Sequence, residues 1–117
     1  IPLLPELGFR GLSTFKPRAL PNPAPRLAQV NAHVDLLDWR QGAAFRGTVA
    51  CVHDIVGHVR AKRLGAADPL EPTGILSHHL AMQSDAWDFL SKLFVATKPH
   101  PACAWTNPKF SVAPEPT

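Results

Sequence analysis

Two short apolar stretches, each leading directly into titratable side chains, constrain this chain more than any other feature of its sequence. Residues 30–35 alternate between apolar and polar side chains, and the chain then continues into Asp38 and Trp39. Such alternation is the period of a β-strand. Residues 74–80 form a second predicted strand that ends in two histidines. Because α/β proteins keep their chemistry at the C-terminal ends of parallel strands, both segments predict site residues. The alternative is a strand, an N-capping aspartate and a buried tryptophan.

Valine spacing predicts a helix between the two strands. Four valines recur at spacings of three, four and three within residues 44–64, which places them on one helical face, and Gly65 ends the helix. Cys51 lies in this helical pattern, and a small core residue is the expected role for such a lone thiol. His53 and His58 are five residues apart, so they do not share a face that could hold a metal.

A second amphipathic helix follows the second strand. Ser84 or Asp85 is its expected cap, and Pro99 follows its end. Its apolar residues occupy positions i, i+3, i+4, i+7 and i+8, which is the pattern of a helix with one buried face. These residues are Ala86, Phe89, Leu90, Leu93 and Phe94.

The rest of the chain is predicted from its prolines and glycines. Residues 1–8 have the composition of the last turns of a helix, so we expect the N-terminus to follow a cut or processed end. Residues 9–15 predict a short strand, and the four prolines of residues 16–28 predict an extended loop. Residues 102–105 are a candidate last strand.

Strands that alternate with helices of this length imply an α/β fold with a parallel sheet or a segment of a barrel. The length of 117 residues allows at most one domain, which we place at residues 1–110 with a proline-rich tail at 111–117. No apolar run approaches the roughly 20 residues of a membrane span, so we expect a soluble protein with no membrane partner. This composition favours the cytoplasm, although two lone cysteines leave the compartment open.

The net charge of +3 is a small excess of cations. Arg60, Lys62 and Arg63 fall in the last turn of the first predicted helix, where they complement the helix dipole. Aromatic residues are not interleaved with these cations, so a nucleic-acid partner is not expected.

Both predicted strand ends would meet at one edge of a parallel sheet. Asp35 or Asp38 would then approach His78 or His79. A carboxylate that accepts a hydrogen bond from one imidazole nitrogen selects the ring tautomer and favours the protonated ring of a general acid. Consecutive strand residues point to opposite faces, so one histidine serves the site and the other is expected to be buried or to contact a helix.

The motifs resemble those of the polysaccharide deacetylase family (NodB-like, carbohydrate esterase family 4). Residues 35–39 match an Asp-x-x-Asp-Trp motif, and residues 76–78 match a later Leu-x-His motif. The order and spacing of further segments are similar to the C-terminal half of bacterial members. These segments are residues 7–13, 29–40, 74–80, 85–93 and 100–105.

The resemblance implies a partial, deformed (β/α) barrel and the removal of N-acetyl groups from a carbohydrate substrate. By position, His78 would protonate the leaving amine and Asp38 would pair with it. Trp39 would form a wall of the acetyl pocket, and Asp35 would hold a structural or substrate-contacting place. The complete family member uses a divalent metal such as zinc.

The sequence departs from the family at the metal. The Asp-Asp motif that carries the catalytic base and one ligand is absent, and no two histidines are four residues apart. His33 with Asp35 and His78 is the remaining donor set, and we predict no metal site in this chain alone.

Two functions therefore remain open. The first is the C-terminal part of a deacetylase, which supplies the acid histidine and needs an N-terminal half for activity. The second is a truncated or degenerate relative that acts only in binding or assembly. Half a barrel exposes sheet edges and apolar surface, so we expect the missing half or a second copy to cover it.

Overall fold

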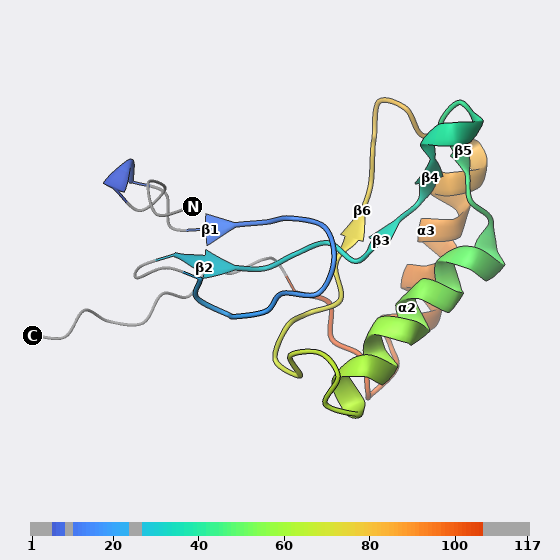
Figure 1. Ribbon diagram of the computed structural model, residues 1–117. Coiled ribbons are helices and arrows are strands. Elements are labelled where there is room, and N and C mark those ends of the chain that lie inside the picture. The colour runs from blue at the N-terminus through green and yellow to red at the C-terminus, as the bar shows by residue number, and fades with distance from the viewer. Residues whose placement is uncertain (1–5, 9–10, 24–26, 107–117) are drawn as a thin grey trace, which may run out of the picture.

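The computed structural model describes residues 6–8, 11–23 and 27–106. The pair of strands β1 and β2 lies at one end of the molecule, and the two helices lie at the other (Figure 1). The strands β3 and β6 cross the space between these two parts. This arrangement places the ends of β3 and β6 beside the helices.

Two of the three strand pairs in the described residues are parallel. β1 (Gly11–Leu12) pairs in parallel with β2 (Ala28–Gln29), and a bridge between Phe15 and Ala32 extends this ladder. β3 (Val34–Asp35) pairs in parallel with β6 (Ile75–Leu76), so that Asp35 is the register partner of Leu76. The predicted strands of residues 30–35 and 74–80 are therefore confirmed in part, as shorter segments.

An antiparallel hairpin departs from the predicted parallel alternation. β4 (Leu37–Asp38) pairs with β5 (Ala44–Phe45), and the 3₁₀ helix η1 (Trp39–Gln41) lies between them. Gly42 closes η1 with φ of +66°, a left-handed conformation that glycine adopts without steric cost. Because the described residues form three separate two-stranded pairs, the partial barrel stays a prediction.

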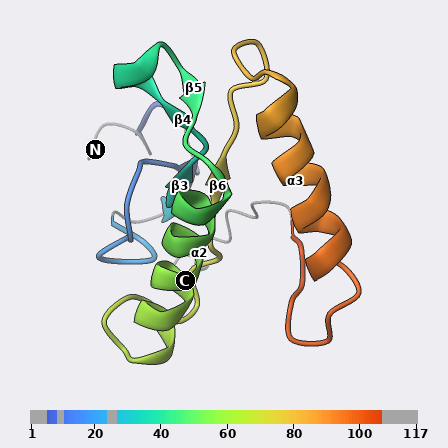
Figure 2. The same ribbon diagram turned by 90° about the vertical axis from the view of Figure 1, so that its right-hand side faces the viewer.

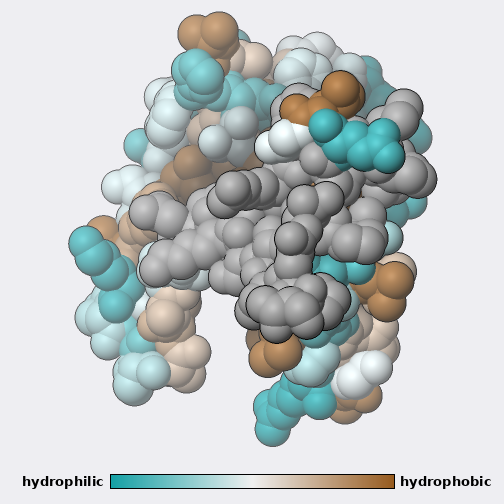
Figure 3. All heavy atoms as spheres, turned by 90° about the vertical axis from the view of Figure 1, so that its left-hand side faces the viewer, coloured by the Kyte–Doolittle hydropathy of each residue, from teal (hydrophilic) through white to brown (hydrophobic). Residues whose placement is uncertain are grey.

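The two predicted helices are confirmed. α2 (Thr48–Arg63) begins after Gly47 and ends at Arg63, and the predicted Gly65 follows the C-cap residue Leu64 with a φ of +77°. α3 (Ser84–Thr97) begins within the predicted segment, but its N-cap residue is Gln83, so the expected cap at Ser84 or Asp85 is wrong. The helices lie side by side (Figure 2), and their lower ends form two separate lobes in the space-filling view (Figure 3). Their packed parts are consequently near their N-termini.

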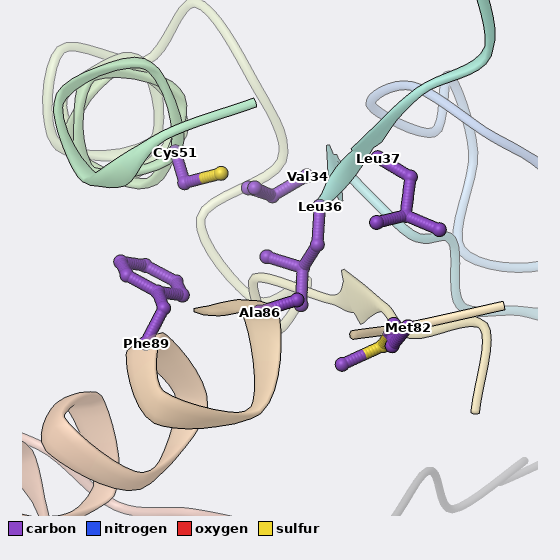
Figure 4. Close-up of a cluster of buried hydrophobic side chains, with 7 residues drawn as sticks. All are labelled: Val34, Leu36, Leu37, Cys51, Met82, Ala86 and Phe89. Carbon is purple, nitrogen blue, oxygen red and sulfur yellow. The ribbon is translucent and has the colours of Figure 1, made fainter. Parts of the chain in front are cut away.

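The hydrophobic core joins the first turns of both helices to the strand ends. Leu36 points toward Ala86 of α3, and Val34 points toward Cys51 of α2 (Figure 4). Cys51 faces this core from α2 and is fully buried, as expected of a small core residue. The buried members of the cluster are Val34, Leu36, Leu37, Cys51, Met82, Ala86 and Phe89.

The valines of α2 do not form its buried face. Their exposed fractions run from 40% for Val52 to 84% for Val49, whereas Cys51 and His58 are the buried residues of this helix. The side of α2 that carries Cys51 and His58 therefore faces the protein interior, and the valine side faces solvent. The spacing of the valines predicted the helix but not its orientation, because orientation depends on what the neighbouring strands offer.

Two further expectations are wrong. Residues 102–105 form no strand, because Cys103 N–H and Ala102 N–H both turn back to His100 and Trp105 Nε1 donates to Thr97 Oγ1. His79 is exposed instead of buried, because β6 stops at Leu76 and the chain enters a turn. The tail at 111–117 lies outside the described residues.

We predict that Leu36→Ala lowers the free energy of unfolding by about 2–5 kcal/mol, because it leaves a cavity in the fully buried core. Urea unfolding followed by circular dichroism measures the effect. Leu80→Ala is the matched control, because the Leu80 side chain is 93% exposed and its loss should change stability little. Equal effects of the two substitutions would contradict this core.

Candidate functional site

The parallel pairing of β3 with β6 brings the two titratable strand ends together. His78 Nε2 lies 3.2 Å from Asp35 Oδ1. The side chains of His78 and Asp35 are 27% and 20% exposed, so the pair is screened from bulk water but reachable. The predicted meeting of an aspartate and a histidine at this edge is therefore seen in the geometry.

Asp35 connects the histidine to the aromatic side chain. Asp35 Oδ1 also accepts the Leu37 N–H at 3.0 Å, and Oδ2 accepts Trp39 Nε1–H at 3.2 Å. The rings of Trp39 and His78 meet edge to face, with centroids 4.7 Å apart and planes at 86°. One carboxylate thus orients both rings.

Asp38 does not take the place expected of it. Its Oδ1 accepts the Arg40 N–H at 3.0 Å, so it caps η1. The chain leaves the extended conformation directly after Asp38, and the cap uses the carboxylate locally. Among the described residues, Asp35 is the aspartate that contacts His78. The family resemblance had instead assigned this role to Asp38.

The contact with Asp35 selects a tautomer of His78. A carboxylate accepts only, so Nε2 carries the hydrogen and Nδ1 carries the lone pair in the neutral ring. Nδ1 makes no hydrogen bond with the part of the chain that the structure describes. The backbone N–H of His78 donates to Met82 Sδ at 3.3 Å, which fixes the position of the residue after β6. The ring can therefore exchange a proton at Nδ1.

An open groove of about 710 Å³ is lined by Asp35 and runs along α2, while His78 lies behind Asp35 and Trp39 and is not part of the groove lining. Asp35, Asp38 and Trp39 lie on one wall, and His53, Asp54 and Gly57 of α2 lie on the other. The side chain of Trp39 is 55% exposed, so it is available to an incoming ligand. The groove is completed by Phe15, Pro17, His33, Leu37, Arg40, Arg46, His58 and Ala61.

A second cluster, whose side chains are nearly buried and border the inner end of the groove, lies at the opposite end of β3. Glu71 has a side-chain exposure of 0%, and its Oε1 lies 2.9 Å from His33 Nε2 and 3.8 Å from His58 Nε2. Its carboxylate also accepts the backbone N–H groups of Arg18 and Asn31, at 3.0 and 3.1 Å. The rings of the two histidines are stacked with centroids 3.6 Å apart.

The three side chains of this cluster do not fit a metal ion, although their donor atoms all lie within 4.8 Å of one another. The Gly74 N–H donates to His33 Nδ1 at 2.9 Å, so the His33 lone pair is on Nδ1 and its hydrogen is on Nε2. A metal on Nε2 would require loss of that hydrogen and of the bond from Gly74. Glu71, moreover, already accepts several hydrogen bonds.

The donor set of His33 with Asp35 and His78 is not assembled either. His33 faces Glu71, whereas Asp35 faces His78. We therefore derive no chemistry in this chain from a bound metal.

Burial lowers the pKa of His58 to about 4, with further lowering by the charges of His33 and Lys62. Its Nδ1 pairs with Thr73 Oγ1 at 2.7 Å, while Nε2 is buried with no hydrogen-bond partner in the described structure. His58 is consequently neutral at physiological pH.

Sequence reasoning missed Glu71 and Arg46. Glu71 lies between two prolines in what was expected to be a simple turn, and no local pattern shows that its carboxylate is enclosed. Arg46 donates from Nη1 to the Asp35 carbonyl oxygen at 2.8 Å, a contact made across the hairpin. The only available signal was an isolated charge within a stretch of small and apolar residues.

No family model, no curated protein and no solved structure matches this chain. Within the described residues, neither helix combines the length and the apolar content that crossing a bilayer requires.

We predict that the free energy of unfolding falls as the pH drops from 6.5 to 4. In this window the unfolded chain protonates His58 whereas the folded chain keeps it neutral, which amounts to about 3 kcal/mol over the whole window. Urea unfolding at a series of pH values measures this slope. His58→Gln should flatten it and His53→Gln, at an exposed position of α2, should not. An unchanged slope in His58→Gln would contradict the assignment.

Proposed function

We propose that this chain supplies the general-acid histidine, its carboxylate partner and an aromatic wall to a hydrolase that removes N-acetyl groups from carbohydrate. The supporting observation is that the two oxygens of Asp35 engage His78 Nε2 and Trp39 Nε1. The motif resemblance supplies the substrate class. In this proposal Asp35, rather than Asp38, is the partner of the acid.

The reaction is hydrolysis of an amide. Water adds to the acetyl carbon, the carbon–nitrogen bond breaks, and the leaving nitrogen takes a proton, so that acetate and a free amine result. His78 donates this proton from Nδ1, while Asp35 holds the opposite nitrogen and the orientation of the ring.

Trp39 contributes shape rather than acid–base chemistry. Its ring stands at the edge of the groove and lies against His78. An apolar face beside the reacting amide suits an acetyl methyl group, and the same face excludes water from the histidine. The polar groups of α2 across the groove suit the hydroxyl groups of a sugar.

The divalent metal of the complete family would polarise the acetyl carbonyl and activate water. The described residues offer no set that fits it, so this proposal requires a partner segment that brings the metal. Within the proposal, this chain acts as the part that binds the sugar and transfers the proton.

We predict that His78→Ala in the complete enzyme lowers kcat for deacetylation by at least about 100-fold, the usual contribution of a general acid. Release of acetate from an N-acetylated oligosaccharide measures the rate, and bound metal should stay unchanged. His79→Ala is the matched control, because His79 is the exposed neighbour in sequence. A rate within a few-fold of the unsubstituted enzyme in His78→Ala would refute the assignment of the acid.

The exposed valines of α2 favour a second candidate function, in which the chain is a non-catalytic module that assembles through this helix. The valines repeat at spacings of three, four and three, which is the spacing of a helix–helix seam. In this reading a second copy covers the apolar stripe, and the groove binds carbohydrate without hydrolysis.

For this candidate, we predict concentration-dependent dimerisation that Val56→Glu weakens by at least tenfold, because it places a charge in the apolar seam. Sedimentation equilibrium measures the association. Val95→Glu, on the exposed side of α3, is the control and should leave association unchanged. A chain that stays monomeric up to high concentration would remove this candidate.

A further inference from the structure

Arg46 connects three elements around the candidate site. It follows β5, and its backbone N–H donates to the Leu36 carbonyl oxygen at 2.9 Å. Its Nη1 donates to the Asp35 carbonyl oxygen at 2.8 Å and lies 2.8 Å from Asp54 Oδ2 on α2. Arg46 alone therefore binds the carbonyl oxygens of both Asp35 and Leu36.

We propose that Arg46 is a positioning residue, which holds the Asp35 carboxylate in the orientation that meets His78. This inference rests on the proposed function, because it gives Arg46 a task in the same acid–base pair. It adds a residue that the motif resemblance does not include. In the described structure Arg46 makes no hydrogen bond to His78, so it acts on the histidine through Asp35.

The mechanism of positioning follows from how Asp35 is held. Its side chain accepts the Leu37 N–H, and its carbonyl oxygen accepts from Arg46. The two bonds fix the backbone on both sides of the Asp35–Leu36 peptide. Without these bonds the Asp35 backbone could turn about its Cα and move the side chain, whose carboxylate oxygen is 3.2 Å from His78 Nε2. A geometry within hydrogen-bond distance tolerates little such movement.

Asp54 makes Arg46 a fixed point rather than a mobile side chain. The hydrogen bond from Arg46 to Asp54 raises the pKa of the guanidinium, which therefore stays charged at every relevant pH. Asp54 belongs to the second turn of α2, whose neighbour Cys51 is locked in the core. Arg46 consequently holds the backbone of Asp35, at the end of β3, in a fixed position relative to α2.

An ordinary surface ion pair would not have this consequence. The side chains of Arg46 and Asp54 are 27% and 33% exposed, and pairs of this kind contribute little to stability. If the ion pair were the whole role, losing Arg46 would not alter a histidine on the far side of Asp35. Arg46 affects the candidate site through its hydrogen bond to the Asp35 carbonyl oxygen.

The test uses the ring ¹⁵N chemical shifts of His78 in this chain, which report the tautomer and the protonation of the imidazole. The unsubstituted chain should show the Nε2–H tautomer, because Asp35 accepts from Nε2. Arg46→Met should lower the ratio of the Nε2–H to the Nδ1–H tautomer several-fold, toward the ratio of a histidine side chain without a partner. Arg46→Lys should restore part of the difference, since an ammonium group still reaches one acceptor.

Arg60→Met is the matched control, because it removes an exposed arginine of α2 and should leave the His78 shifts unchanged. His78 shifts in Arg46→Met identical to those of the unsubstituted chain would overturn the proposal. If Arg46→Met does not fold, Asp54→Asn decides, because it loosens the guanidinium and leaves its bond to Asp35 in place. A smaller change in the same direction would support positioning, and no change would refute it.

Asp35→Asn separates this inference from the proposed function. If it leaves the His78 shifts unchanged, the Asp35–His78 pair itself is refuted, and the proposed function fails with it. If Asp35→Asn changes these shifts and Arg46→Met does not, the pair stands and only the role of Arg46 is refuted. In the complete enzyme, Arg46→Met should lower kcat about tenfold or more with little change in KM, as expected when a catalytic pair is misaligned.

Discussion

The buried carboxylate of Glu71 is the interaction on which the rest of this structure depends. It joins three segments, because it accepts hydrogen bonds from Arg18 and from Asn31 and His33 before β3, while its own loop leads into β6. A carboxylate with no exposure to solvent is tolerated only with such partners, and removal of one partner of a buried ionic group costs about 3–5 kcal/mol. The Glu71 cluster thereby sets where β3 and β6 begin to run together.

Close approach of the two strands is the second part of this constraint. His33 N–H and Val34 N–H both donate to the Gly74 carbonyl oxygen, and Gly74 N–H donates to His33 Nδ1. A Cβ atom on Gly74 would lie 2.4 Å from the Asn31 carbonyl oxygen, so only glycine fits. Two residues further along each strand, the same register delivers Asp35 beside Leu76 and therefore close to His78. The buried contacts at the start of β3 and β6 set the strand register, and the partly exposed ends of the two strands place Asp35 beside His78.

Buried and half-exposed carboxylates have different tasks in this chain. Glu71 is enclosed, saturated with donors and faces a histidine whose hydrogen is already fixed, so it is structural. Asp35 keeps one edge toward the groove and shares its oxygens between a backbone N–H, an indole and an imidazole. Arg46 then relates the position of Asp35 to α2. The candidate site thus depends on a strand pair, a hairpin and a helix at once.

The sequence alone determined the local elements and the chemical character of the strand ends. Helical spacing located α2 and α3, and Gly65 marked an end correctly, because these signals depend on neighbours three or four residues away. The meeting of an aspartate with His78 also followed, since it requires only two parallel strands in neighbouring positions. Its identity as Asp35 did not follow, because the turn after Asp38 uses that carboxylate as a helix cap.

Only the tertiary structure decided the orientation of α2 and the burial of Glu71. The valine stripe and the side bearing Cys51 and His58 are both compatible with a core, and contact with β3 selects the second. Glu71 and Arg46 act on residues that are distant in sequence, at separations of 38 for His33 and 11 for Asp35. No periodicity encodes such contacts. The physical reason is that charge compensation in a dry interior is a property of what surrounds a side chain, and the surroundings exist only after the chain has folded.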